Sequence, residues 1–107
     1  MARRQPYILA FASEVARQLQ AIDAKHYGLI REKIGEQLRV EPTAETTNRK
    51  PLRQPAPFGA TWEIRFGPDN RFRVLYDIDE AAHLVQIMAI GEKHRERLFI
   101  GGEEVQL

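Results

Sequence analysis

The sequence contains no cysteine, and it has little excess charge of either sign. Without cysteine the chain forms no disulfide, offers no thiolate to a metal ion and has no cysteine nucleophile. Its three histidines are isolated and share no spacing typical of a metal site, so we expect neither a metal nor another cofactor. The net charge of +1 does not by itself predict a nucleic-acid partner.

Long apolar runs are also missing. No stretch approaches the roughly 20 residues that a membrane-spanning helix needs, and the first residues lack the apolar segment of a signal peptide. We therefore expect a cytoplasmic protein. The length of 107 residues suits one domain, because a typical domain takes roughly 100–150 residues. The prediction is a single domain over residues 1–107.

Three consecutive segments have the composition of β-strands, at residues 61–66, 71–78 and 83–90. In the first segment Trp62, Ile64 and Phe66 alternate with polar residues, which is typical of a strand with one buried face. The alternation places Arg65 on the non-core face, and in the second segment it does the same for Arg73. The linkers are short enough for hairpins, so the pattern predicts an antiparallel meander.

Two helices are predicted between a first short strand at residues 6–11 and this meander. Ser13 is a plausible N-cap for the first helix. The second helix begins at about Ala24 or Lys25 and ends near Val40, because the Glu-Pro pair that follows disfavours continuation. Its apolar stripe consists of Tyr27, Ile30, Ile34 and Leu38. Together the helices should form a hairpin over one face of the sheet.

The remaining segments complete the predicted architecture. Residues 41–60 are rich in Pro, Thr, Asn and Gln and should be largely irregular. Gly91 should end the last strand, and residues 92–99 should form a short final helix. The predicted fold class is α+β, in the order β-α-α-β-β-β with a short C-terminal helix. A curved antiparallel sheet should pack on the N-terminal helical hairpin.

Basic residues are concentrated in one part of the chain. Between Arg49 and Tyr76 there are six basic and two acidic residues, which gives a local charge of +4 and leaves −3 for the rest. Such a block is either an anion-binding surface or a solvated loop and strand face, and the charge pattern alone leaves both interpretations open.

Four short motifs follow one another along the chain: Lys50-Pro-Leu-Arg53, Trp62-Glu-Ile-Arg65, Phe72-Arg-Val-Leu-Tyr76 and Ile90-Gly-Glu-Lys-His94. With these motifs and the predicted order of elements, the chain resembles the RelE/ParE family of type II toxin–antitoxin toxins along nearly its whole length. The resemblance implies a cognate antitoxin as partner. RelE-like members are ribosome-dependent endoribonucleases that cut mRNA, whereas ParE-like members inhibit DNA gyrase.

Cleavage of RNA by its own 2′-hydroxyl needs a proton acceptor, cations at the phosphorane and a proton donor for the leaving 5′-oxygen. Arg65 and Arg73 should point to one face and converge on a phosphate. The resemblance implies that Arg73 stabilises the transition state and that Arg65 is its basic neighbour. Lys93 falls where RelE has a general-acid arginine, and His94 is a possible substitute, since its reference pKa of about 6.5 suits proton transfer.

Four further residues are predicted to contact RNA: Lys50, Arg53, Arg71 and Phe99. Phe99 falls near a functional tyrosine of RelE, although Lys50 and Arg53 could equally anchor a loop. Glu63 departs from the family pattern, because ribosome-dependent members carry a lysine there; it could act as a base or pair with Arg65. The preferred interpretation is a metal-independent mRNA interferase. The alternatives are a non-enzymatic gyrase inhibitor and an inactive relative that only binds its antitoxin.

Overall fold

The computed structural model describes residues 5–107. Within these residues the strands are β1 (Ile8–Phe11), β2 (Arg49–Pro51), β3 (Trp62–Phe66), β4 (Phe72–Asp79), β5 (Leu84–His94), β6 (Arg97–Ile100) and β7 (Glu103–Val105). The helices are α1 (Val15–Leu19) and α2 (Tyr27–Leu38), and short 3-10 turns occur at Ala24–His26, Pro57–Gly59 and Pro68–Asn70. The predicted α+β class is confirmed.

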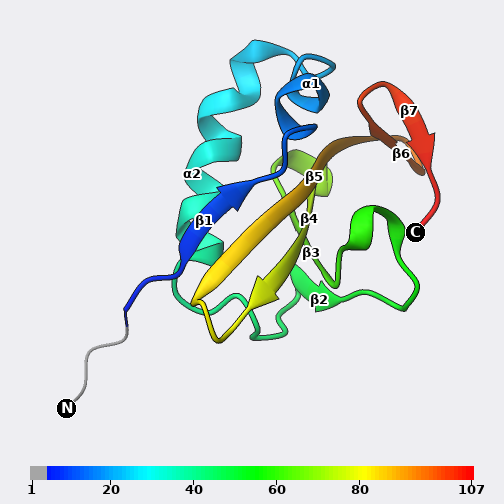
Figure 1. The fold of residues 1–107 in the computed structure, drawn as a ribbon. Helices are drawn as coiled ribbons and strands as arrows, with labels where there is room; N and C mark the ends of the chain where they lie inside the picture. The colour runs from blue at the N-terminus through cyan, green and yellow to red at the C-terminus, as the bar shows by residue number, and fades with distance from the viewer. Residues whose placement is uncertain (1–4) are drawn as a thin grey trace.

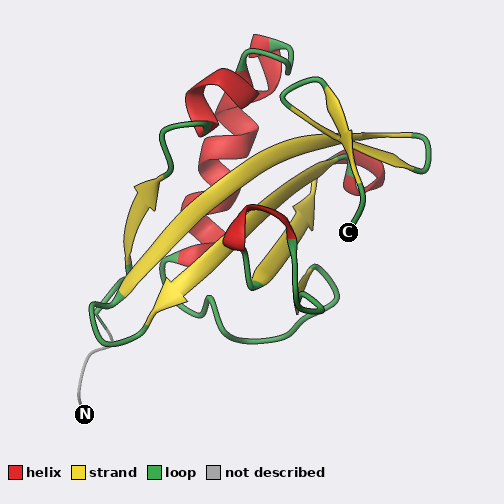
Figure 2. Ribbon diagram, turned by 45° about the vertical axis from the view of Figure 1, so that its right-hand side comes forward, coloured by secondary structure: helices red, strands yellow, loops and turns green. Residues whose placement is uncertain are grey.

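The strands form one curved sheet around β5 (Figures 1 and 2). The order β2-β3-β4-β5-β6-β7 is antiparallel throughout, and β4 accompanies β5 from Leu84 to Glu92. On its other edge β5 pairs first with β1, in parallel, and then with β6 from Gly91 onward. The first and last parts of the described chain are therefore held by the same strand.

Helix α2 covers one face of the sheet (Figure 2). Its stripe of Ile30, Ile34 and Leu38 is buried, as the periodicity predicted. These side chains join the apolar residues that β3, β4 and β5 turn toward the helix, among them Phe72 and Ile87. Burying each side chain of this size stabilises the folded state by roughly 1.5–3 kcal/mol. This contact therefore fixes which sheet face is the inner one.

The predicted N-terminal helical hairpin is present only in part. Helix α1 is five residues long, and Ser13 does not cap it, since its N-cap position is Glu14 and no side-chain cap bond forms there. The chain then leaves the helix, and the Asp23 side chain accepts a hydrogen bond from the Lys25 backbone N–H at 3.0 Å. Asp23 thus starts the turn that leads into α2, a capping signal of the usual Asx type. The hydrogen bond lowers the pKa of Asp23.

The predicted C-terminal helix is wrong. Strand β5 continues through Gly91 to His94, a tight turn follows with Arg95 at φ 59°, and the chain returns as β6 and β7. Leu98 and Ile100 explain this outcome, because they alternate along β6 and are buried, as in a strand with one covered face.

A second apolar cluster lies on the sheet face turned away from α2, which we call the outer face. Its buried members are Ala60, Leu75, Ala89, Leu98 and Ile100, and Leu52, Met88 and Val105 pack against them. The β6–β7 hairpin and the segment before β3 therefore cover part of this face. The prediction of one irregular segment over residues 41–60 missed β2, which adds an edge strand beside β3.

Gly91 is required by close packing rather than by a turn. A Cβ at this position would lie 2.6 Å from Ile100 Cγ1 and 2.7 Å from the Phe99 carbonyl oxygen. We expect Gly91→Ala to lower the free energy of unfolding by about 2–3 kcal/mol, because overpacking against backbone is poorly relieved. Gly28→Ala is the matched control: its Cβ meets nothing within 4 Å, and it should stabilise by about 0.5–1 kcal/mol. Urea unfolding measures both, and equal midpoints for Gly91→Ala and wild type would contradict the prediction.

Candidate phosphate site on the outer face

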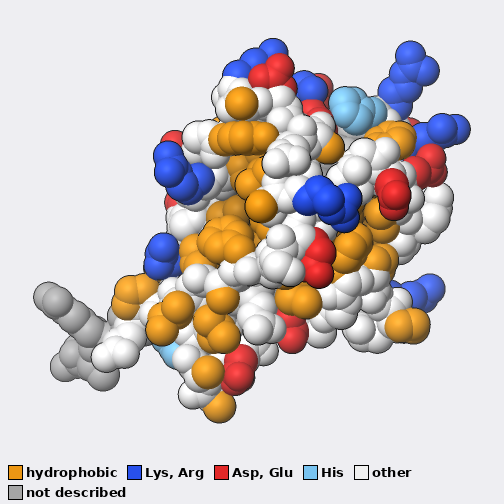
Figure 3. All heavy atoms as spheres, turned by 45° about the horizontal axis from the view of Figure 1, so that its top comes forward, with side chains coloured by type: hydrophobic (Ala, Val, Ile, Leu, Met, Phe, Trp, Pro, Cys, Tyr) orange, Lys and Arg blue, Asp and Glu red, His pale blue; other side chains and the backbone are white. Residues whose placement is uncertain are grey.

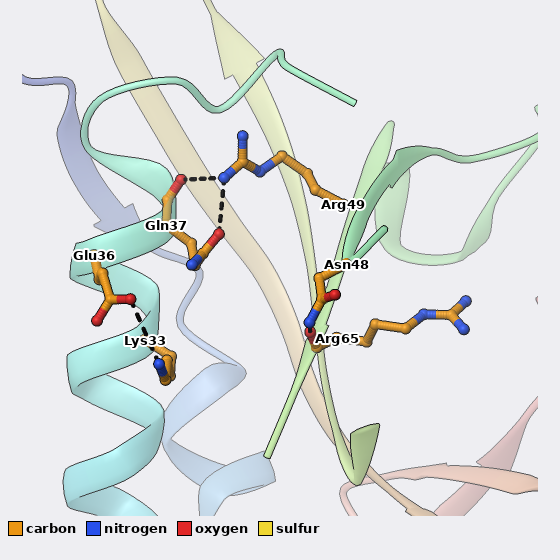
Figure 4. A network of polar contacts seen from close by, with 6 residues as sticks. All are labelled: Lys33, Glu36, Gln37, Asn48, Arg49 and Arg65. Atoms are coloured by element: carbon orange, nitrogen blue, oxygen red, sulfur yellow. Dashed lines mark hydrogen bonds and ion pairs between the residues drawn. The ribbon is translucent and has the colours of Figure 1, made fainter. Parts of the chain in front are cut away.

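Arg65 and Arg73 are direct cross-strand neighbours. The register of β3 and β4 pairs them, between the inward pairs Ile64–Val74 and Phe66–Phe72. Both side chains therefore leave the sheet on the outer face. Figure 4 shows Arg65 pointing away from α2, whereas Arg49 reaches toward it. The expected juxtaposition of the two arginines is present; their role in catalysis stays a prediction.

Glu63 lies between the two guanidinium groups. Its Oε1 accepts a hydrogen bond from Arg65 Nη2 at 3.1 Å, and its Oε2 lies 3.5 Å from Arg73 Nη1. The Glu63 side chain is 1% exposed, against 27% for Arg65 and 11% for Arg73. Of the two roles open to it, pairing is the one observed, and a carboxylate so deeply covered is badly placed to take a proton from a ligand.

The same arrangement acts on the ionisation of Arg73. Burial lowers the pKa of Arg73, and the neighbouring charge of Arg65 adds to this effect, while Glu63 opposes both. Glu63 therefore holds two adjacent guanidinium groups close together, since removing it would leave like charges facing each other at the sheet surface.

Two lysines extend this positive region. Lys50 on β2 is exposed and pairs in register with Glu63, so it shares the outer face. Lys93 follows Gly91 by two residues on β5, and Gly91 pairs with Arg73, which puts Lys93 on the same face. Its Nζ lies 3.9 Å from the Glu96 carboxylate. We call Lys50, Arg65, Arg73 and Lys93 the basic cluster.

His94 does not belong to the basic cluster. It alternates with Lys93 along β5 and lies with Glu92, which is paired in register with the core residue Phe72. Its Nε2 is 3.3 Å from Glu92 Oε1, and Arg71 Nε donates to the other oxygen of that buried carboxylate. The structure therefore does not bring the four predicted catalytic residues together on one face of the sheet.

Arg71, His94 and Phe99 gather instead at a second location. The His94 and Phe99 rings meet edge to face, with centroids 5.8 Å apart. They border a pocket of about 290 Å³ whose other lining residues are Ala21, Ile22, Glu92, Gly101 and Gly102. Two groups of predicted residues are thus separated by the sheet, and any contact of Phe99 or Arg71 with RNA would occur away from Arg73.

Arg49 is an anchoring residue of this region whose role sequence reasoning missed. It is buried and donates to the backbone oxygens of Gln37, Glu41 and Ala44, and to the Gln37 side chain at 2.9 Å (Figure 4). It thereby ties the segment after α2 to the sheet, the anchoring role considered for Lys50 and Arg53. Arg53 itself is exposed. The only sequence feature that pointed to Arg49 was the block of basic residues between Arg49 and Tyr76.

Neither a metal site nor a membrane span is found in residues 5–107. No three His, Asp or Glu side chains there are grouped so that they could hold a metal ion. None of the helices in this part of the chain is long and apolar enough to cross a membrane.

The order of strands, the helix-covered inner face and the basic outer face define a RelE-like α+β fold. A chain in the crystal structure of the toxin–antitoxin complex RelBE2 from Mycobacterium tuberculosis shares this fold, with a TM-score of 0.65 and 25% sequence identity. The match covers 90% of this chain and 99% of that chain. It confirms the resemblance to the RelE/ParE family that the sequence motifs indicated. No family model matches the sequence, and no curated protein does.

Proposed function

We propose that this protein is the toxin of a type II toxin–antitoxin module and that it acts in the cytoplasm as a ribosome-dependent mRNA interferase. The observation that carries the proposal is the pairing of Arg65 with Arg73 on the outer face. Two guanidinium groups that converge on one phosphodiester can stabilise the charge of a pentavalent phosphorane without a metal ion or another cofactor. The similarity to a chain of a RelBE2 toxin–antitoxin complex supports the same class.

The proposed reaction is attack of an RNA 2′-hydroxyl on the adjacent phosphorus, with loss of the hydroxyl proton to solvent water and departure of the 5′-oxygen. Arg65 and Arg73 bind the non-bridging oxygens, and Lys93, on the same face, supplies the proton or the charge that the leaving oxygen needs. Lys50 and the exposed Arg53 hold the flanking phosphates. Because His94 lies with Glu92 on the other side of β5, Lys93 is the better candidate donor.

The alternative function is inhibition of DNA gyrase without chemistry. Glu63 favours it, because this carboxylate occupies both arginines and stands where ribosome-dependent members carry a lysine. The separation of His94 from Arg73 favours it as well, since it removes one of the two candidate proton donors from the outer face.

Expression in cells without the partner protein distinguishes these functions. We expect protein synthesis to stop at once and primer extension to map new 5′ ends within translated mRNA. Induction of the SOS response with filamentation and intact mRNA would instead identify a gyrase inhibitor. Unimpaired growth would identify an inactive relative that only binds its antitoxin.

The proposed partner is an antitoxin that inserts apolar side chains into a groove beside α2. Residues of β1, α1, α2 and β5 line this groove, which has a volume of about 430 Å³: Phe11, Leu19, Tyr27, Ile30, Arg31, Ile34 and Ile90. Figure 3 shows hydrophobic side chains gathered across this side of the molecule, with Lys and Arg around them. An amphipathic helix fits such a groove, and an acidic residue on it could pair with Arg31.

A further inference from the structure

The buried carboxylate of Glu63 is an unexpected component of a site for an anion. It brings the charge of the group formed by Glu63, Arg65 and Arg73 to +1, because two guanidinium groups are opposed by one carboxylate. We propose that Glu63 shifts the preference of the site toward an internal phosphodiester, which carries one negative charge, because it weakens the binding of a terminal phosphate, which carries two, more strongly. This inference rests on the proposed phosphate site and names the kind of phosphate that it takes.

The geometry keeps Glu63 in place when an anion arrives. Each of its oxygens contacts a different guanidinium group, at 3.1 and 3.5 Å, and the side chain is almost completely covered. The carboxylate cannot be displaced into solvent without leaving two adjacent arginines unopposed. A bound phosphate therefore shares the guanidinium groups with Glu63 and experiences its repulsion.

Repulsion grows with the charge of the ligand. Coulomb energy is proportional to the product of the charges, so a dianion loses twice the free energy that a monoanion loses when Glu63 is present. If the loss for a monoanion is a factor f in affinity, the loss for a dianion is f². The two lysines of the basic cluster have a smaller effect on the affinity for either anion, since Lys50 is exposed to solvent and Lys93 is near Glu96.

The selectivity fits the proposed reaction. The scissile phosphate is a diester, and attack of the 2′-hydroxyl breaks the bond to the 5′-oxygen while it forms a 2′,3′-cyclic diester, again with one charge. RNA that ends in a phosphate monoester is neither substrate nor product of this step. Glu63 would weaken the binding of such ends more than it weakens the binding of the interior of a chain.

The test compares dimethyl phosphate with methyl phosphate at pH 8, where the latter is a dianion because its second pKa is about 6. Nitrogen-15 labelled protein at low ionic strength is titrated with each compound, and the arginine side-chain resonances are followed by NMR. In the variant E63Q we expect affinity to rise about ten-fold for dimethyl phosphate and about a hundred-fold for methyl phosphate. Glu80→Gln changes the same charge in the exposed β4–β5 turn and should alter neither affinity.

The double variant E63Q/R65Q restores the charge of +1 and should return the ratio of the two affinities to the wild-type value. Thermal melting will show whether E63Q alone folds, and if it folds poorly the double variant is compared directly with wild type. An equal change of both affinities in E63Q, or a ratio in the double variant that stays at the E63Q value, overturns the proposal. Failure of the proposed function would give a different result. Phosphate binding would still depend on Glu63 and Arg73, but no mRNA would be cut.

Discussion

Arg73→Ala is expected to lower the rate of mRNA cleavage by roughly a hundred- to a thousand-fold, the usual effect of removing one donor that stabilises transition-state charge. Arg73 is the more enclosed of the paired arginines, at 11% exposure against 27% for Arg65, so its charge is less screened by water. Primer extension on mRNA from cells that express each variant measures the loss, and purified protein with programmed ribosomes gives the rate.

Two controls separate lost chemistry from lost folding. Arg73→Ala leaves Glu63 with one guanidinium partner instead of two, and a buried carboxylate with fewer partners destabilises the fold. The double variant R73A/E63Q removes that charge, so it should recover the melting temperature but not the cleavage. Arg39→Ala removes an exposed arginine at the C-terminal end of α2 and should cleave normally. Cleavage by Arg73→Ala at the wild-type rate would exclude the proposed role of the arginine pair.

Phe11→Glu is expected to weaken antitoxin binding by at least about a hundred-fold while cleavage of mRNA continues. Phe11 is 53% exposed on β1 and lines the groove beside α2, so an antitoxin helix would bury most of its ring. A carboxylate there has to be desolvated on binding, which costs several kcal/mol when no cation is added, and it also repels an acidic partner.

Ile8→Glu is the matched control for this experiment. It introduces the same charge on the same strand at a residue that is 64% exposed and outside the groove. Calorimetry with the antitoxin should give near wild-type affinity for Ile8→Glu, and co-expression should still neutralise that variant. Equal losses for both variants would show that β1 as a whole, rather than the groove, carries the contact.

The fold was predictable where one pattern dominated. The spacing of Ile30, Ile34 and Leu38 is compatible only with a helix, and the alternation around Ile64 is compatible only with a strand. The C-terminal part was not predictable in this way. Residues 92–99 are polar enough for a surface helix, and only the packing of β6 on the outer face, where Gly91 leaves room, decides for a hairpin.

The site was predictable to the same extent. Alternation on two neighbouring strands was sufficient to bring Arg65 and Arg73 together. It could not assign the face of His94, because the β4–β5 register skips Met88 and strand β5 runs on past Gly91. Nor could it show that Glu63 is buried, since that depends on how both arginines fold over it.

The order in which β5 acquires its neighbours has a consequence for synthesis of the protein. β1 is hydrogen-bonded along its length to residues 84–87, and the last part of β5 is completed only by β6. A nascent chain therefore cannot fix β1 until residues 84–87 have left the ribosome, because contacts between segments so far apart in the sequence form late. The pairing of Arg65 with Arg73 joins neighbouring segments, β3 and β4, and does not wait for this closure.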